Sequence, residues 1–231
     1  MTFVKNKNGL WRLLSLLVVG FSLSMPALAS FQLESTGIVL EESKGRVSFN
    51  ITNSSSEPIL LASKLADLDN SSMSKNVLIS PPITRIDAGQ SQQVNFVLKK
   101  GVALPHEVLL RASFEGIVQA SESSARMPVR QNVGLIIQPA SVAANKAPWE
   151  TLEVKLEGSK LLISNTSKHV VRLSQALTLK PSGKVVSLIA PYILVGEKLA
   201  FDVGTSVTSV EITPFSRYGF QMDQTTLSVK R

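Results

Sequence analysis

The sequence contains no cysteine and only two histidines in 231 residues. Without cysteine no disulfide can form, so each domain must be held together by its packed core. Zinc sites are built mainly from Cys and His, and the chain has no H-E-x-x-H or similar spacing. We therefore expect no metal site, and we interpret His106 and His169 as solvated loop residues.

The sequence also lacks the common motifs of catalysis. It has no G-x-S-x-G turn for a nucleophilic serine, no G-x-x-x-x-G-K-S/T loop for phosphates and no G-x-G-x-x-G loop for dinucleotides. We expect a protein that is not an enzyme and that uses no cofactor. A hydrolase is the competing interpretation, but it would need a nucleophile beside a base, and the two histidines are poorly placed for that role.

Long apolar runs are absent except near the N-terminus. Three basic residues precede an apolar run over 13–21, which is followed by Ala27-Leu28-Ala29. This is the layout of a secretory signal peptide with an A-x-A cleavage site. The run is far shorter than the roughly 20 residues that span a bilayer. We expect residues 1–29 to be removed after Ala29, and the mature protein not to insert into a membrane.

The excess of positive charge is small once this leader is set aside. The chain has 24 basic and 17 acidic residues, and the leader holds three of the basic ones. The remaining 202 residues carry 21 basic and 17 acidic side chains, a net charge of +4. A charge of this size is ordinary for solubility. Because no block of Lys and Arg is interleaved with aromatics, we expect no nucleic-acid binding.

Short strand patterns follow one another along the rest of the chain. Val47, Phe49 and Ile51 alternate with polar residues, and the segment 94–98 does the same. About seven such segments, separated by turn residues, lie between positions 37 and 137. Seven short strands are typical of an immunoglobulin-like sandwich. The sequence therefore predicts an all-β chain of two immunoglobulin-like β-sandwich domains joined by a short hinge.

The division into domains rests on a break in this patterning. A stretch of small residues bounded by prolines occupies 139–148, and alternation resumes at Leu152. We predict an N-terminal domain over 30–138, a hinge over 139–148 and a C-terminal domain over 149–231. Both halves also run a strand into a similar turn, Asn53-Ser54-Ser55 in the first and Asn165-Thr166-Ser167 in the second. This repeat is expected if both domains contain a similar hairpin.

Positions 47–60 and 80–94 carry motifs that can be compared with known proteins: the first runs a strand into an Asn-Ser-Ser turn followed by Pro58, and the second contains Pro81-Pro82, Arg85-Ile86 and Gly89. Positions 47–60 resemble the second strand and N-x-S/T…P corner of the periplasmic chaperones of the chaperone–usher pathway of pilus assembly, and positions 80–94 are similar to the P-P…R-I/L-x-P-G-x-x-Q-x-V/L segment of that family. Positions 161–167 and 190–194 resemble two corners of its second domain. The resemblance implies a periplasmic protein that caps pilin or fimbrial subunits and delivers them to an outer-membrane usher. A structural or adhesive surface component with the same fold is the alternative.

The resemblance also implies which strand binds the subunit. Family members complete the sandwich of a subunit by donating a strand, and the corresponding segment here is 125–137. Ala125, Met127, Val129 and Val133 lie on one face of it and are the candidate subunit-binding residues. From Val133 onward the same face is better interpreted as ordinary core. Pro128 removes one backbone donor, which a strand tolerates only at an edge or bulge.

The family usually grips the C-terminal carboxylate of the subunit with an arginine and a lysine. The corresponding positions here are Gly37 and Gly134, so this basic pair is absent. Arg111, Arg126 and Arg130 are the candidates to replace it. For each of them, a solvated surface arginine is the competing interpretation.

Overall fold

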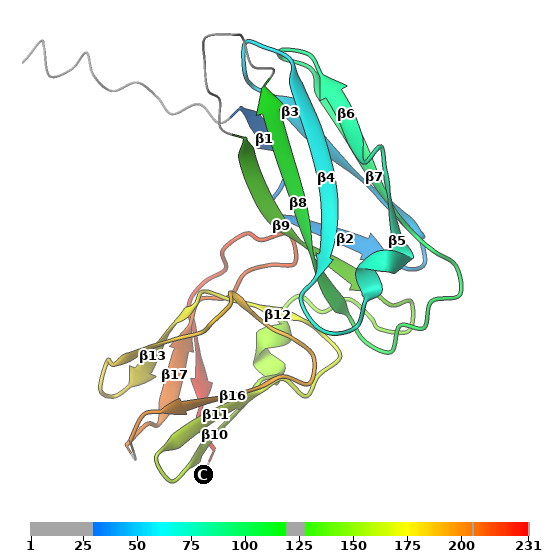
Figure 1. Ribbon diagram of the computed structural model, residues 1–231. Helices are drawn as coiled ribbons and strands as arrows, with labels where there is room; N and C mark the ends of the chain where they lie inside the picture. Colours follow the sequence, from blue (N-terminus) through cyan, green and yellow to red (C-terminus); the bar gives the residue numbers. More distant parts are fainter. Residues whose placement is uncertain (1–29, 119–127, 205, 231) are drawn as a thin grey trace, which may run out of the picture.

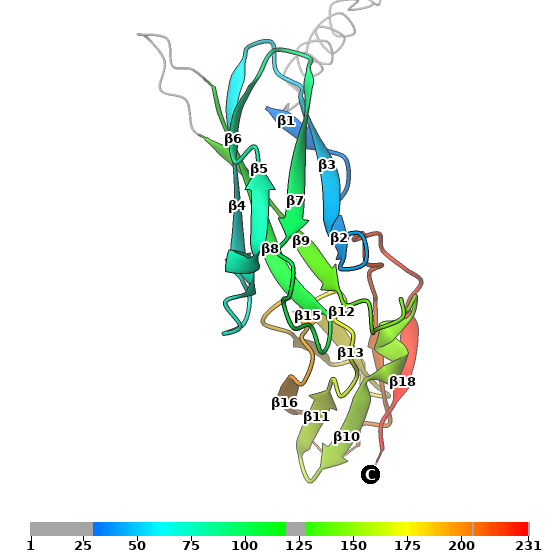
Figure 2. The ribbon, with the colours of Figure 1, turned by 90° about the vertical axis from the view of Figure 1, so that its right-hand side faces the viewer.

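The computed structural model describes residues 30–118, 128–204 and 206–230. Two β-sandwich domains lie end to end at an angle, with the C-terminus in the domain at the bottom of the view (Figures 1 and 2). The predicted fold class is confirmed. The leader, 1–29, lies outside the described residues. Within the described part of the chain, no helix has the length and apolar character needed to cross a membrane.

Domain 1 consists of two packed sheets. The first has the order β1 (Phe31–Leu33), β3 (Arg46–Asn53), β7 (Ser91–Leu98) and β5 (Val77–Ser80). The second has the order β2 (Gly37–Glu41), β9 (Val129–Gln138), β8 (Val108–Val118), β4 (Ile59–Asp67) and β6 (Ile83–Ile86). A short 3-10 helix, η1 (Met73–Asn76), precedes β5.

The core between these two sheets is built from the alternating residues of the strands. Phe49 of β3 and Phe96 of β7 are buried, as the alternation predicts. Both contact Phe114 of β8: the Phe49 and Phe114 rings stack with centroids 5.4 Å apart, and Phe96 meets Phe114 edge-on at 6.3 Å. Aromatic pairs of this kind stabilise a core beyond the area they bury. Domain 1 therefore holds itself together without a disulfide.

The first segment of domain 1 changes sheets, which the sequence did not indicate. β1 pairs antiparallel with β3, whereas β2 pairs parallel with β9 in the other sheet. Between them the Ser35 side chain donates to the backbone oxygen of Gly37, 2.7 Å away. Three residues are too few to show a period, so β1 was not predicted. The switch places β1 beside β9, where the Gln131 side chain donates to the backbone oxygen of Phe31 at 2.8 Å.

Domain 2 has shorter strands arranged in three small sheets. They have the orders β10 (Glu153–Glu157), β11 (Lys160–Ser164), β16 (Lys198–Asp202); β12 (Val171–Arg172), β15 (Tyr192–Ile193); and β14 (Val185–Ser187), β13 (Ala176–Lys180), β17 (Ser209–Ile212), β18 (Thr225–Ser228). Its buried core is mostly aliphatic, with Trp149 of the 3-10 helix η2 (Pro148–Thr151) at its margin. The polar β18 and the two-residue β15 were not predicted.

The repeated turn noted in the sequence is a repeated structure. Asn53 is fully buried, and its amide group donates to the backbone oxygens of Glu57 and Ile86 at 2.8 and 2.9 Å. The Asn53 side-chain oxygen accepts the backbone N–H and the hydroxyl of Ser55. In domain 2, Asn165 makes the same four bonds, to His169, Ile193 and twice to Ser167. In both domains this turn joins strands of different sheets, β3 to β4 and β11 to β12, so the repeat is a corner between sheets and the expectation of a hairpin is wrong.

The strands of domain 1 end at Gln138, and those of domain 2 begin at Glu153. The segment between them contains the short helix η2 at its end. The exact limits of the two domains, and a hinge over 139–148, stay predictions.

Candidate functional site

One edge of β9 is paired over only half of its length. On one side, β9 pairs with β8 from Val129 to Ile137. On the other side, its pairing with β2 begins only at Gly134. Residues 129–133 thus have a strand neighbour on one side only among the described residues. β9 runs from the far end of domain 1 toward domain 2 (Figure 1), and an unpaired edge of this kind is a template for another strand.

The side chains of β9 are exposed at its start and mostly buried toward its C-terminal end. Val129 is 37% exposed, whereas Val133 is only 7% exposed and packs in the domain 1 core with Leu135 and Ile137. The core interpretation of the segment from Val133 onward is confirmed, and a role of Val133 in binding a subunit stays a prediction. Pro128 is exposed directly before β9, as expected for an edge. Ala125, Arg126 and Met127 lie outside the described residues.

Ile136, an apolar residue on the otherwise polar face of β9, packs between the domains. It forms a small buried cluster with Leu109 of β8 and Val170 of domain 2. The polar face of β9 therefore becomes a domain contact at its C-terminal end.

A groove of about 800 Å³ borders the free edge of β9. Its walls come from Val129, Gln131 and Val133 of β9, from residues 31–36 of domain 1 and from 219–221 of domain 2. The domain 2 loop in this wall exposes large apolar side chains, among them Tyr218 and Phe220. An apolar strand added to β9 would thus meet both domains.

A second, smaller pocket of about 400 Å³ lies where the two domains meet. Gly37, Gly134 and Arg111 stand in one row across the sheet, because Gly134 pairs with Gly37 on one side and with Arg111 on the other. Directly paired residues point to the same face of a sheet. Arg111 and Gly134 line this pocket, together with Arg172 of β12 in domain 2.

The two glycines leave room for Arg172. A Cβ atom at Gly37 would lie 2.6 Å from Nη1 of Arg172 and 2.7 Å from the backbone oxygen of Arg217. A Cβ atom at Gly134 would lie 3.6 Å from Cζ of Arg172. The guanidinium group of Arg172 therefore lies over the two positions where the resemblance leads us to expect a basic pair. The sequence analysis missed this residue.

Arg172 is held by backbone oxygens rather than by a carboxylate. Its Nη1 donates to the Arg217 backbone oxygen at 3.1 Å, and its Nη2 donates to the Thr36 backbone oxygen at 3.4 Å. Among the described residues, no acidic side chain forms an ion pair with it. Burial lowers the pKa of Arg172, because a charged group loses favourable hydration when it is buried.

The neighbouring arginine, Arg217, has a carboxylate partner. The Glu107 side chain is 2% exposed, and its Oε1 lies 3.0 Å from Nη2 of Arg217. Its Oε2 accepts the backbone N–H of Val170 at 3.0 Å. Glu107 comes directly before β8 of domain 1, whereas Arg217 and Val170 belong to domain 2. This buried carboxylate therefore ties the two domains together.

The interpretation of His169 as a solvated loop residue is wrong. Its side chain is 15% exposed, and its Nδ1 lies 3.4 Å from Oε1 of Glu107. His106 is half-buried, with Nδ1 2.9 Å from the Glu107 backbone oxygen. Both loops are covered because the domains meet there, and a contact between domains leaves no local period in the sequence. Among the described residues, no group of three or more His, Cys, Asp or Glu side chains is arranged to hold a metal ion.

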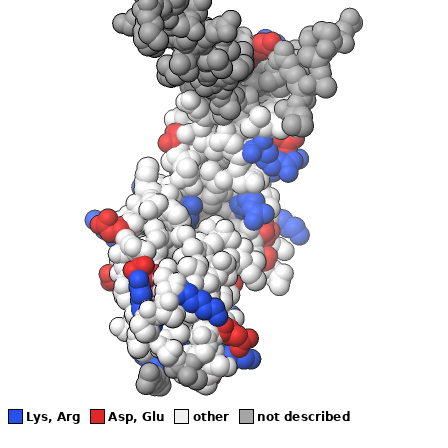
Figure 3. Space-filling view, turned by 90° about the vertical axis from the view of Figure 1, so that its left-hand side faces the viewer, with Lys and Arg blue, Asp and Glu red and all other residues white. Residues whose placement is uncertain are grey.

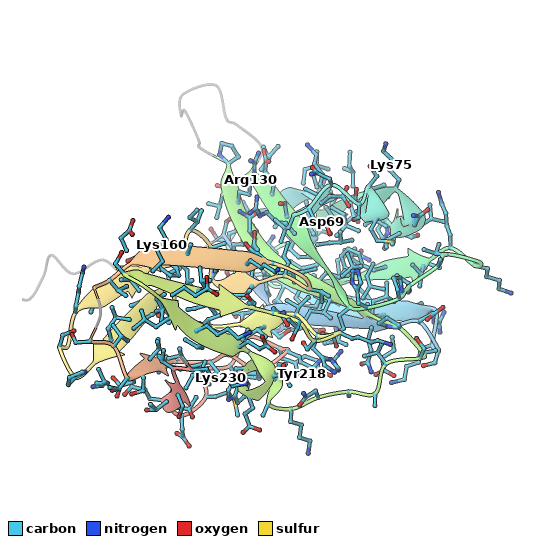
Figure 4. All side chains as sticks on the ribbon, turned by 90° about the horizontal axis from the view of Figure 1, so that it is seen from below. Asp69, Lys75, Arg130, Lys160, Tyr218 and Lys230 are labelled. Atoms are coloured by element: carbon cyan, nitrogen blue, oxygen red, sulfur yellow. The ribbon has the colours of Figure 1, made fainter. Side chains whose placement is uncertain are left out.

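The three candidate arginines have different surroundings. Arg111 is exposed and lines the pocket between the domains. Arg130 is exposed and pairs with Glu115, with Nε 3.0 Å from Oε2. Arg130 and Tyr218 lie on opposite sides of the molecule when it is seen from below (Figure 4), whereas the Tyr218 backbone would nearly touch a Cβ atom at Gly37. Arg130 pairs with Glu115 in the sheet and so lies outside the row of Gly37, Gly134 and Arg111. Arg126 lies outside the described residues.

Figure 3 shows one face of the molecule, on which most of the described surface is uncharged. The Lys and Arg groups and the Asp and Glu groups on this face are small, and several groups of opposite charge adjoin. A partner on this face would meet chiefly uncharged side chains.

The chain is similar to proteins of pilus assembly. A family model described as "Pili and flagellar-assembly chaperone, PapD N-terminal domain" matches residues 30–143. The "Uncharacterized fimbrial chaperone YhcA" of Escherichia coli K12 is 36% identical over 202 residues, which cover 86% of this chain and 90% of the relative. The chaperone protein PmfD of Proteus mirabilis is 23% identical, over 84% of this chain and 80% of the relative.

Solved structures share the fold. A chain from the complex of the Salmonella enterica SafA pilin with the SafB chaperone superposes with a TM-score of 0.72 at 20% identity, over 88% of this chain and 98% of its own length. The CupB2 chaperone of Pseudomonas aeruginosa gives a TM-score of 0.71 at 17% identity, over 86% of this chain and its full length. The identity to YhcA over most of both chains, together with the matching domain model, shows that this chain belongs to the family of pili and flagellar-assembly chaperones.

Proposed function

We propose that this protein caps fimbrial subunits in the periplasm by donating a strand to them, and that it delivers them to an outer-membrane usher. The observation that carries the proposal is the half-paired edge of β9, where among the described residues no strand pairs with 129–133 on the side opposite β8. Relatives of the chain bear the name of fimbrial chaperone, and a chain of the same fold comes from a complex with a pilin.

The physical basis is strand addition at an open edge. A subunit that lacks one strand exposes an apolar groove and unpaired backbone groups, both of which favour aggregation. A donated strand supplies hydrogen bonds to the backbone and alternate apolar side chains to the groove. Val129 is the described side chain placed to do so, and Ala125 and Met127 continue its face in the sequence. Capping of this kind needs no catalysis and no cofactor, so we propose that the protein is not an enzyme.

The periplasmic location rests on the predicted leader, since removal of 1–29 would follow export. Family membership favours this function over that of a structural or adhesive surface component. The carboxylate anchor of the subunit stays a proposal. Of the candidate arginines, Arg111 has the most support, because it lines the pocket between the domains in the row of Gly37 and Gly134.

The test compares Val129→Asp with Arg130→Ser, two exposed neighbours on opposite faces of β9. Each variant is expressed together with a fimbrial subunit in the periplasm, and the soluble complex is purified. Val129→Asp should abolish the complex, because a charge would enter the apolar groove of the subunit. It should leave the free protein folded, because Val129 is exposed. Arg130→Ser should retain most of the complex, and equal recovery from both variants would reject the proposed edge.

A further inference from the structure

Arg172 is a half-buried cation with unused hydrogen-bonding capacity. A guanidinium group has five N–H donors, and the described contacts of Arg172 are the two bonds to the backbone oxygens of Arg217 and Thr36. Both acceptors are neutral, so the charge of Arg172 is not balanced by them. The charge of Arg217, whose backbone oxygen accepts the hydrogen bond from Arg172, is balanced by Glu107. The pocket at Arg172 is therefore suited to an anion that the protein itself does not supply.

The geometry of β9 shows what kind of anion could arrive there. A strand added to the free edge at 129–133 must stop where β2 begins to occupy the same edge, at the pair Gly37–Gly134. Arg172 lies at this point, with Nη2 3.4 Å from the backbone oxygen of Thr36. The end of an added strand would therefore reach the guanidinium group.

The charge of Arg172 selects the direction of that strand. If the added strand runs parallel to β9, its C-terminal carboxylate reaches Arg172 and is attracted by it. If the strand runs the other way, a positive N-terminal amine meets the guanidinium group and is repelled. Planar guanidinium groups also match carboxylates in shape, with two parallel hydrogen bonds.

We propose that Arg172 of domain 2 binds the C-terminal carboxylate of the subunit strand that adds to β9, and that Gly37 and Gly134 are glycines because Arg172 occupies the space beside them. Arg111 lines the same pocket and adds a second positive charge. The anchor then belongs to domain 2, whereas the edge belongs to domain 1. Capture would thus require the two domains to keep the orientation that Glu107 holds.

The inference rests on the proposed function, so its test starts from a fimbrial subunit that the wild-type protein captures. Arg172→Ala should lower the yield of the soluble complex at least about tenfold, since hydrogen bonds between charged partners are lost. Arg46→Ala, which removes an exposed arginine of β3, is the matched control and should leave the yield unchanged. A second variant combines Arg172→Ala with Gly134→Lys.

The rescue by Gly134→Lys follows from the structure. The atoms nearest to a Cβ atom at this position would be the far ends of Leu109, at 3.2 Å, and of Arg172, at 3.6 Å or more. With Arg172 removed, a lysine at 134 can direct its ammonium group into the same pocket. The double variant should recover part of the lost yield. Gly37→Lys is not suited to rescue, because the obstacle there includes the backbone of Arg217 and Tyr218.

Arg172 also bridges the two domains, so a structural effect must be separated from carboxylate binding. For this purpose the subunit is extended by Gly-Ser at its C-terminus, which moves the carboxylate. The extension should weaken capture by the wild-type protein and should add little to the loss caused by Arg172→Ala, because both changes remove one interaction.

The inference would be overturned if Arg172→Ala gave the wild-type yield of the complex. It would also be overturned if the extension lowered the yield by the same factor in Arg172→Ala as in the wild-type protein, because the two losses would then be independent. The first test, with Val129→Asp, examines the proposed function separately. If Val129→Asp blocks capture and Arg172→Ala does not, the proposal that the edge of β9 binds the subunit is supported, and only the assignment of Arg172 is wrong.

Discussion

The two domains contain the same asparagine corner but differ in the strands around it. Asn53 and Asn165 make matching sets of four hydrogen bonds. In domain 1, however, β8 and β9 have 11 and 10 residues, whereas no strand of domain 2 exceeds five residues. Because β9 is long, it begins several residues before the point where the parallel strand β2 starts to pair with it. The shared corner therefore stabilises both folds, and the difference in strand length creates the free edge.

The buried cores of the two domains also differ in composition. Phe49, Phe96 and Phe114 lie fully buried between the sheets of domain 1, and domain 2 buries mainly Leu, Ile and Val. The short strands and loops of domain 2 contribute contacts at the junction of the domains. Domain 2 supplies Arg172, Arg217 and the loop with Tyr218 to that junction.

The largest effect is expected at the contact between the two domains. Glu107→Ala removes a buried carboxylate and leaves Arg217 and the N–H of Val170 without their acceptor. Breaking a buried ion pair by removing one partner costs about 3 to 5 kcal/mol. We expect the two domains to unfold in separate transitions in calorimetry, because their contact is lost. An unchanged thermogram would mean that Glu107 does not hold the domains together.

The two asparagine corners should respond alike. Asn53→Ala and Asn165→Ala each leave several backbone and hydroxyl groups without partners, and each should lower the free energy of unfolding by about 2 to 3 kcal/mol. Urea denaturation of the two variants measures this. A large loss for one variant and almost none for the other would show that the two corners are not equivalent in stability, despite their matching bonds.

The two glycines should respond differently. Gly37→Ala puts a Cβ atom against the backbone of domain 2, where it cannot be accommodated without a shift of the domains. We expect a loss of about 1 to 3 kcal/mol. Gly134→Ala meets the end of the Leu109 side chain at 3.2 Å and should cost less than about 1 kcal/mol. Thermal unfolding of both variants checks this, and a reversed order would contradict the described domain contact.

The smallest effect concerns Asp67 at the end of β4. Slight burial raises the pKa of Asp67, but hydrogen bonds from the side chain and backbone of Ser74 and the backbone of Met73 outweigh it and lower the pKa. Stability from Asp67 is present above the unfolded pKa of about 3.9 and is lost as the pH falls through the lower folded pKa. Asp67→Asn should therefore destabilise slightly at pH 7 and not at pH 2. An equal effect at both pH values would exclude this linkage.

Local sequence patterns predicted the strands whose buried residues alternate and the turns whose residues are neighbours in the sequence. The alternation at Phe49 and Phe96 and the turn at Asn53 are each visible within a few residues. β1 and β15 are too short to show a period, and β18 is polar. His169 and Arg172 were misjudged or missed for another reason: their neighbours come from the other domain. The strand β9 was therefore predictable from the sequence, whereas the residues that meet at the domain junction were not.

Amide hydrogen exchange tests the central claim, that the free edge of β9 receives the subunit. In the free protein, the backbone N–H groups within 129–133 that point away from β8 should exchange quickly, because no strand covers them. In the purified complex with a fimbrial subunit, these same amides should become protected, while those of 134–138, already paired with β2, should change little. Unchanged exchange over 129–133 in the complex would contradict the account.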